Sequence, residues 1–377
     1  MPPDAARFRA PSRKINGGAG IVHPVSWDLL KTMRTRLNEL PRWRAYIVLG
    51  LTLAAFIGLL MLALGRAPVV PAEAATAAAP EGDLVSYQRI IERLRGGADY
   101  YTAAHEVLVA DGYGTRSVFN WRTPAWPLLL AALPPGGGQG VLAALALVGL
   151  LLVYRMLREE GGVLVAVLSM LAAGISLGGI VAPASVVFSE VAAGTLILIS
   201  VAAYGNGWRL AGLLVGLLAL FLRELAAPYV VVAIVLALRQ RRWSEVRLWG
   251  LGLAAYATYF GWHWWMVSQQ LGPMDRAYGD GWLQFGGVGF ILATAGFNGL
   301  WSLGPVWLPA LLLPLGVLGL WAWPTGTLAL ATVVVFVVLF AAVGKPFNFY
   351  WGALYTPLLM LGLGWAVAAV WETLRQR

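Results

Sequence analysis

Long apolar runs alternate with short polar links along most of the chain. The first run, 45–65, is 21 residues long, and a helix needs about 20 apolar residues to cross a bilayer core. Further runs lie at 139–154, 161–178, 187–204, 209–222, 228–239, 246–265, 305–322, 327–343 and 352–371. A glycine-rich run at 286–303 is ambiguous. The pattern predicts an all-α polytopic membrane protein with about ten transmembrane helices, or eleven if 286–303 also crosses.

Basic residues are unevenly distributed between the loops that this arrangement produces. With ten spans, most of the 27 Lys and Arg residues fall in the N-terminal segment and in the loops on its side of the membrane. The positive-inside rule then places both termini in the cytoplasm, whereas with eleven spans the C-terminus lies outside. We expect a multi-pass protein of a bacterial-type cytoplasmic (inner) membrane. Its expected parts are a cytoplasmic basic segment 1–44, an integral membrane domain 45–371, a first extracytoplasmic loop 66–138 and a cytoplasmic tail 372–377.

Composition narrows the possible chemistry. Hydrophobic residues make up 59% of the chain and charged residues 12%, against about 25% charged in soluble domains. Cysteine is absent, and the three histidines have no metal-ligand spacing. We therefore expect no metal site and no cofactor. The net charge of +9 is explained by membrane topology, so nucleic acid is not an expected partner.

The first span is expected to be an uncleaved anchor, although small residues at 71–80 leave cleavage open.

The loop 66–138 is the densest polar segment after the first span. Apolar spacing predicts amphipathic helices over 84–95 and roughly 99–110, separated by a Gly-Gly pair of the kind that ends helices. Asp83 and Asp99 are candidate general bases, because burial and neighbouring cations can tune a carboxylate near a membrane surface. A solvated loop aspartate is the alternative for each. Tyr100 and Tyr101 follow Asp99, and adjacent tyrosines are also typical of membrane interfaces.

Several other polar residues lie close to predicted spans. Charges near or in the membrane are costly unless they are paired or hydrated, which makes Glu190, Arg223 and Glu224 candidates for function or for interhelical pairing. Arg223 and Glu224 are adjacent, so on a helix they would point in different directions and find separate partners. The remaining candidates for contacts with a phosphate or a sugar are Asn120, Arg122 and Lys345.

These residues together resemble the polytopic glycosyltransferases of the C-type fold, which use polyprenyl-phosphate sugars. The likeness covers most of residues 45–371 and is closer to the bacterial mannosyl- and arabinosyltransferase-like subfamilies than to oligosaccharyltransferases. It rests on five elements in the sequence. They are Gly82-Asp83 with Tyr87, Gly97 with Tyr100-Tyr101, Asn120 to Pro124, Ser189-Glu190, and Arg223-Glu224 with Pro228.

The resemblance implies transfer of a sugar, with inversion, from a polyprenyl-phosphate donor to a hydroxyl of a lipid, glycan or protein acceptor. Asp83 matches the family's base, and Asp99 is the alternative. Arg223, Lys345 and Arg276 are the implied ligands of the donor phosphate. Substrate contacts are expected from Tyr87, Tyr100, Tyr101, Asn120, Arg122, Glu190 and Glu224. The alternative function is a transporter or flippase of a lipid or small solute, although the two halves of the chain show no obvious repeat.

Overall fold

The computed structural model describes residues 34–65, 82–273, 275–277 and 284–375. Within these residues the fold is entirely helical and contains no strand, which confirms the predicted all-α class. Residues 1–33 of the expected cytoplasmic segment 1–44, and the small-residue stretch 71–80, lie outside the described residues. The helices are α1 (Arg42–Leu64), α2 (Gly82–Arg95), α3 (Tyr100–Ala110), α4 (Ala125–Ala132), α5 (Gly137–Leu177), α6 (Ser189–Gly205), α7 (Arg209–Leu222), α8 (Ala227–Arg239), α9 (Trp243–Gln270), α10 (Gly287–Gly296), α11 (Leu308–Ala322), α12 (Thr327–Ala342), α13 (Thr356–Met360) and α14 (Gly362–Arg375).

Short 3₁₀ turns link many of these helices. They are η2 (Arg36–Glu39), η3 (Val118–Asn120), η4 (Gly178–Val181), η5 (Pro183–Val187), η6 (Glu224–Ala226), η7 (Gly299–Leu303) and η8 (Pro346–Leu354). Two of them, η5 and η8, begin with proline, which starts a helical turn without loss of a hydrogen bond because its missing N–H would have no partner there. Three of the turns, η5, η6 and η8, lie beside the polar site described below.

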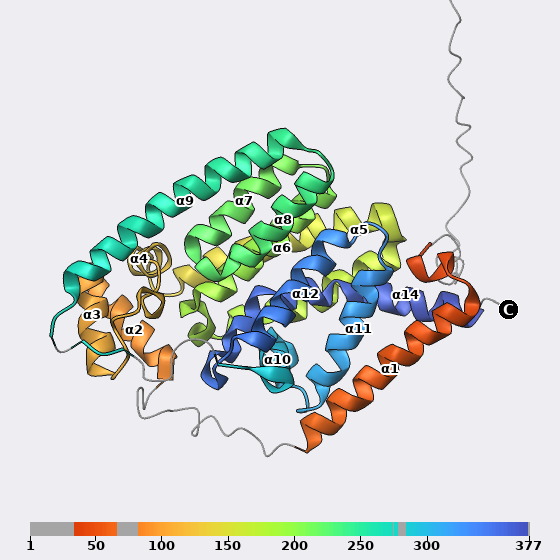
Figure 1. Ribbon diagram of the computed structural model, residues 1–377, viewed down its shortest axis with the longest axis horizontal. Helices are drawn as coiled ribbons and strands as arrows, with labels where there is room; N and C mark the ends of the chain where they lie inside the picture. The colour runs from red at the N-terminus through yellow and green to blue at the C-terminus, as the bar shows by residue number, and fades with distance from the viewer. Residues whose placement is uncertain (1–33, 66–81, 274, 278–283, 376–377) are drawn as a thin grey trace, which may run out of the picture.

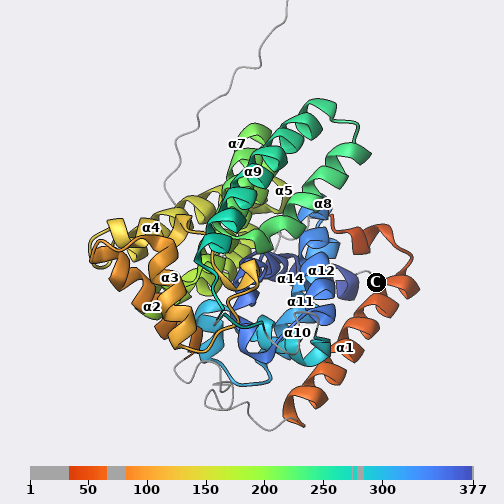
Figure 2. The same cartoon turned by 60° about the vertical axis from the view of Figure 1, so that its left-hand side comes forward.

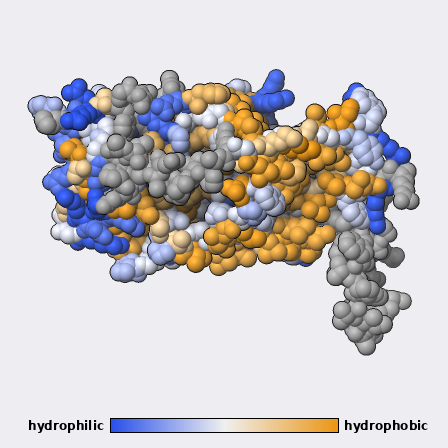
Figure 3. Space-filling model, turned by 90° about the horizontal axis from the view of Figure 1, so that it is seen from below, coloured by the Kyte–Doolittle hydropathy of each residue, from blue (hydrophilic) through white to orange (hydrophobic). Residues whose placement is uncertain are grey.

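The first helix lies along the outside of the bundle. Helix α1 packs against α11 and α14 (Figures 1 and 2), and apolar side chains such as Leu51 and Met61 are 65% and 69% exposed. An apolar helix with such side chains exposed is typical of a surface that faces lipid. Figure 3 shows that hydrophobic residues cover the middle of the molecule, while hydrophilic residues gather at the end that carries α2 and α3 and at the opposite tip.

Three helices in the described part of the chain are long and apolar enough to cross a membrane. They are Arg42–Leu64, Gly137–Val181 and Thr356–Arg375. The other apolar helices are shorter, as in α10, whose 10 residues extend about 15 Å at 1.5 Å per residue. The apolar helices therefore indicate a membrane-embedded protein, and the count of ten or eleven spans stays a prediction.

The longest helix, α5, is folded back on itself at Gly162. Its backbone there has φ +74° and ψ 179°, a conformation that is essentially restricted to glycine. A Cβ atom on Gly174 would lie 3.5 Å from the Leu150 side chain, so the two halves run side by side. The two halves correspond to the predicted apolar runs 139–154 and 161–178.

Contacts among turns bring the predicted cytoplasmic links to one end of the bundle. The Arg155 guanidinium lies 5.2 Å from the Trp208 ring centroid, Arg36 donates a hydrogen bond to the Pro324 carbonyl, and Thr35 donates to Glu372. We call this part the basic end. It comprises η2, the end of α14, residues 155–160 of α5 just before its break, and the turns 206–209, 239–242 and 323–327.

The opposite end carries residues 82–138 of the predicted loop 66–138, which fold as a small helical unit (Figure 1). Helices α2 and α3 match the predicted amphipathic helices, and Gly97 at φ +88° ends α2 as expected. Ile90, Tyr100, Leu108 and Trp121 form a hydrophobic cluster with Val267 of α9. Because this cluster includes a residue of α9, the unit is fixed to the bundle rather than being a separate loop.

Candidate active site

Asp83 lies in the first turn of α2, where its carboxylate is held by two tyrosines from different parts of the chain. Tyr113 donates a hydrogen bond to Oδ1 at 2.5 Å, and Tyr350 of η8 donates to Oδ2 at 2.5 Å. Burial, together with the charge of Asp83, raises the pKa of the Tyr113 hydroxyl. The tyrosines therefore stay protonated and act as donors, which fixes the orientation of the carboxylate.

Arg122 connects Asp83 to the interior of the bundle. It donates a hydrogen bond to the Tyr350 hydroxyl at 2.6 Å, and its guanidinium lies 3.5 Å from Glu190. The guanidinium carbon also lies 5.0 Å from the Tyr87 ring centroid, within the range of a cation–π contact. The Arg122 carbonyl accepts a hydrogen bond from Tyr100. Asp83, Tyr87 and Arg122 are thus brought together.

A buried group of three charges continues from Arg122. Glu190, in the first turn of α6, is fully buried, and its Oε1 lies 2.8 Å from Nε of Arg223, whose side chain is 2% exposed. Arg223 also forms an ion pair with Glu224. Buried charges are stable only when other charges or polar groups compensate them, and here each charge has an opposite partner.

The expectation that Arg223 and Glu224 have only separate partners is wrong. Helix α7 ends at Leu222, and Arg223 has the extended backbone angles φ −152° and ψ 116°. Because Arg223 lies outside the helix, its side chain is not turned away from that of Glu224, and the two form an ion pair. Arg223 also reaches Glu190, so one guanidinium is shared between two carboxylates.

We call these connected residues the polar network. Within the described residues, Nε of Arg122 and Oε2 of Glu224 are buried and have no hydrogen-bond partner. Buried polar atoms are normally satisfied, so these two atoms indicate places for a ligand or for water. The network consists of Asp83, Tyr113, Arg122, Glu190, Arg223, Glu224 and Tyr350.

An apolar cavity begins at the charged pair Arg223–Glu224. Its volume is about 460 Å³, and it is bounded by segments of α8, α9, α12 and η8. Apart from the two charges, its walls are almost entirely hydrophobic, as shown by Leu225, Phe260 and Trp351. A cavity with charges at one end and hydrocarbon walls suits a molecule with a polar head and an apolar chain.

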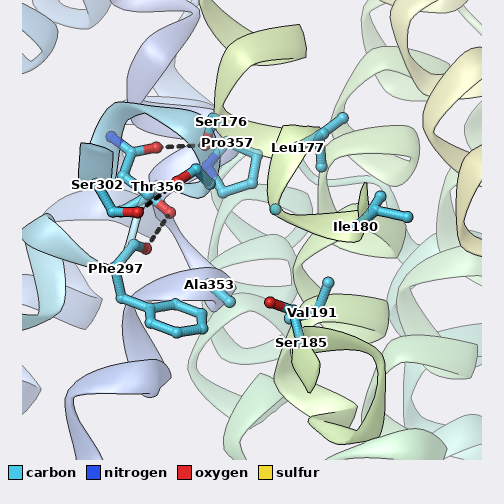
Figure 4. A pocket seen from close by; sticks show the side chains of 13 residues that line it. Ser176, Leu177, Ile180, Ser185, Val191, Phe297, Ser302, Ala353, Thr356 and Pro357 are labelled. Carbon is cyan, nitrogen blue, oxygen red and sulfur yellow. Dashed lines mark hydrogen bonds between the residues drawn. The ribbon is translucent and has the colours of Figure 1, made fainter. Parts of the chain in front are cut away.

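A second, smaller cavity lies beyond an aromatic wall (Figure 4). The Phe188 ring stacks on Tyr350 at a centroid distance of 4.5 Å and meets Phe297 edge-to-face at 6.2 Å. Ser302 and Thr356 lie on one side of this cavity, and Ser185 lies on the other. With a volume of about 70 Å³, the cavity offers hydroxyl groups close to the polar network.

Asp99 has a different environment from Asp83. Its exposed side chain caps α3 by accepting hydrogen bonds from the Tyr101 and Thr102 amides, at 2.9 and 3.2 Å. Such a cap typically contributes about 1 kcal/mol to helix stability. Of the two candidate bases, only Asp83 contacts the polar network.

The remaining sequence candidates are divided between the network and the surrounding structure. Tyr101 bonds to His263 at 3.0 Å, and the Asn120 side chain donates to the Gly114 carbonyl, so both fix the loop unit. The Arg276 side chain is exposed, while its carbonyl accepts from the Arg116 amide. Lys345 is 7% exposed and precedes η8, the turn that supplies Tyr350.

Asp275 is a buried carboxylate that the sequence analysis did not single out. Its side chain is 3% exposed and accepts hydrogen bonds from the Gly272 amide at 2.6 Å, from Thr115 and from His105 at 2.8 Å. Burial opposes ionisation, but these bonds outweigh it and hold the pKa of Asp275 below its usual value. Asp275 therefore ties the segment after α9 to the loop unit. Only its charge and the flanking glycine and proline could have drawn attention to it.

The sequence analysis also missed Tyr113 and Tyr350. Tyr113 lies between two glycines in the predicted loop, and Tyr350 lies in the aromatic stretch that follows Lys345. Tyrosine is common at membrane interfaces, so neither position carried a distinct signal.

No family model, curated protein or solved structure matches this chain. The expected absence of a metal and a cofactor stays a prediction.

Proposed function

We propose that this protein is a membrane glycosyltransferase that transfers a sugar from a polyprenyl-phosphate donor to an acceptor hydroxyl, with Asp83 as the general base. The observation that carries the proposal is the position of Asp83 in a network that ends at a charged, apolar-walled cavity. We call the end of the bundle that carries the polar network the network end. In this proposal the network end faces the extracytoplasmic side of a bacterial-type cytoplasmic membrane, and the basic end faces the cytoplasm.

The cavity beside Arg223 is the proposed place for the donor. Its hydrophobic walls suit an isoprenoid chain, and its charged end suits the phosphate. The network contains three carboxylates and two guanidiniums, so an anionic donor requires further positive charge. Lys345 adjoins the turn that contributes Tyr350 and Trp351, and Arg276 is exposed beside the loop unit. These two cations, together with Arg223, are the proposed ligands of the donor phosphate.

Asp83 is the proposed base because its carboxylate is oriented and still accessible. Each carboxylate oxygen accepts one tyrosine hydrogen bond and has a second lone pair for an acceptor hydroxyl. In the reaction the acceptor oxygen forms a bond to the anomeric carbon, and the bond from that carbon to the phosphate oxygen breaks. The hydroxyl proton passes to Asp83, and the polyprenyl phosphate leaves with the bonding electrons. Cations near the phosphate stabilise its developing charge.

The direct test is transfer from radiolabelled polyprenyl-phosphate sugars to membrane acceptors. Loss of a general base typically costs a factor of about 10²–10⁴, so Asp83→Asn should lose transfer by that factor while it remains folded. Asp111→Asn is the matched control, because Asp111 lies in the same loop unit and its side chain bonds to Ser86 and Arg89 of α2, outside the polar network. If Asp99→Asn loses activity and Asp83→Asn retains it, the assignment of the base is wrong.

A transporter or flippase is the second candidate, favoured by one observation. A polar cavity also exists at the basic end, so polar sites occur at both ends of the bundle. Between them the side chains of Leu220, Tyr229 and Trp249 are fully buried, which leaves the described core closed. If the purified protein moves lipid or solute across liposomes and transfers sugar from no donor, the glycosyltransferase proposal fails.

A further inference from the structure

A polar cavity at the basic end is distant from the proposed reaction. Its volume is about 400 Å³, and it lies among the turn of α5, the end of α6, the α7 and α9 N-termini, the end of α8 and the turn between α11 and α12. Its floor is apolar, with Met156, Val201 and Leu236. Its polar lining includes Glu160, Tyr204, Arg209, Gln240, Arg242 and Glu245.

Glu245 is the residue that points to a ligand. Its side chain is 8% exposed, and its Oε2 accepts a hydrogen bond from Arg242 at 2.6 Å. The Tyr204 hydroxyl lies beside this carboxylate. The other carboxylate oxygen, Oε1, is buried, and neither it nor the Tyr204 hydroxyl nor Arg242 Nε has a hydrogen bond of regular geometry among the described residues. A buried carboxylate oxygen without a well-aligned donor is costly. A ligand in this cavity that supplies a donor to Glu245 would remove that cost.

The other walls of the cavity are already fixed in place. Glu160 accepts a hydrogen bond from the Trp323 indole at 2.5 Å and another from Thr325. Arg36 of η2 donates to Thr327 at 3.0 Å, which holds the turn between α11 and α12 at the rim. Arg209 lies exposed on the opposite side. The cavity thus has fixed walls, an exposed arginine on one side, and the buried carboxylate of Glu245 as a hydrogen-bond acceptor.

We propose that this cavity binds a phosphate ester whose substituent carries a hydrogen-bond donor, either an ammonium or a hydroxyl group. Arg209 and Arg242 hold the phosphate, because guanidinium groups match phosphate oxygens geometrically. The donor on the substituent bonds to Glu245 Oε1 and to the Tyr204 hydroxyl. The apolar floor accommodates the carbon atoms beyond the phosphate.

The surroundings of the cavity fit a phospholipid as the source of this group. Trp208, Leu210 and Trp243 flank the cavity turns and are 46%, 58% and 59% exposed. Exposed tryptophans beside arginines are typical of a membrane–water interface, which is where phospholipid head groups lie. A soluble phosphate ester has the same chemistry, and the experiment below distinguishes the two sources.

The test uses the full-length protein purified in detergent and titrated with short-chain phospholipids, with the apparent melting temperature as readout. Dioctanoyl phosphatidylethanolamine and phosphatidylglycerol should stabilise the wild type. Dioctanoyl phosphatidylcholine should not, because its head group has no N–H or O–H donor. Glycerophosphoethanolamine is the soluble probe, and if it binds as tightly as the lipids, the ligand is a soluble phosphate ester rather than a lipid.

Two variants keep the proposal testable. Glu245→Gln removes the buried charge, and Arg209→Gln changes only an exposed residue, so it should fold normally. Each should weaken phosphatidylethanolamine binding at least tenfold. Arg155→Gln is the control, because Arg155 is an exposed cation at the same end that does not line the cavity. The proposal is overturned if phosphatidylcholine binds as well as phosphatidylethanolamine, or if Arg209→Gln binds like the wild type.

Discussion

The polar network and the exposed arginines of the basic end use charge in opposite ways. At the network end, Glu190 and Arg223 are almost completely buried and contact one another. At the basic end, Arg155, Arg209 and Arg239 are exposed to solvent. A buried charge must be compensated because its desolvation is costly, whereas an exposed charge needs no partner and gains little from one. Burial and pairing, rather than residue type, therefore distinguish the charges of the polar network from the exposed arginines of the basic end.

The largest expected effect comes from breaking the shared guanidinium at the network end. Arg223→Met leaves Glu190 and Glu224 buried without their main partner, and removal of one member of a buried ion pair typically costs about 3–5 kcal/mol. The apparent melting temperature of the purified protein should fall sharply. The matched substitution Arg155→Met, in an exposed pair whose atoms are 4.0 Å apart, should change stability by less than about 1 kcal/mol. Equal effects of the two substitutions would remove the distinction between the ends.

A smaller effect is expected from the hydroxyl that joins Asp83 to Arg122. Tyr350→Phe removes a donor to Asp83 and an acceptor for Arg122. Hydrogen bonds to charged groups typically contribute about 1.5–3 kcal/mol, so stability should fall by less than in Arg223→Met, and sugar transfer should fall as well. Tyr46→Phe is the control, because Tyr46 is 50% exposed on α1. A Tyr350→Phe protein with wild-type stability and transfer would show that the network does not depend on this link.

The smallest effect concerns acid sensitivity at the network end. The pKa of Asp275 is lower in the folded protein than its usual value of 3.8. Its ionised form therefore adds stability above that pH, and this contribution is lost as the pH falls through the lowered pKa. Asp275→Asn should destabilise the protein by about 1 kcal/mol near pH 6. The difference from wild type should shrink below about pH 4, as measured by melting temperatures between pH 6 and pH 3. A difference that is constant with pH would contradict the assignment.

Local patterns in the sequence predicted many, but not all, of the helices. The amphipathic spacing before Gly96 and Gly97 predicted α2, and the next polar turn predicted the start of α3. The break in apolar character after residue 154 predicted two segments where the structure has the folded-back halves of α5. These features depend on residues within one or two helical turns of each other, which is the range over which periodicity and glycine conformation act.

The candidate site was predictable only in part. Asp83, Arg122, Glu190, Arg223 and Glu224 were all selected from the sequence, because charges beside apolar runs are unusual. Their connections were not predictable. Asp83 and Tyr350 are 267 positions apart in sequence yet share a hydrogen bond, and Tyr350 has the same local appearance as any interfacial tyrosine.

The sequence by itself determined that this chain is helical and suited to a membrane, because apolar runs of sufficient length have few other stable forms. It also determined which charges lie near those runs. Only the tertiary structure decided that Asp83 joins the network while Asp99 caps a helix, and that Arg223 leaves α7 to contact two glutamates. The reason is that pairing and burial depend on which distant segments pack together, and local sequence does not encode that directly.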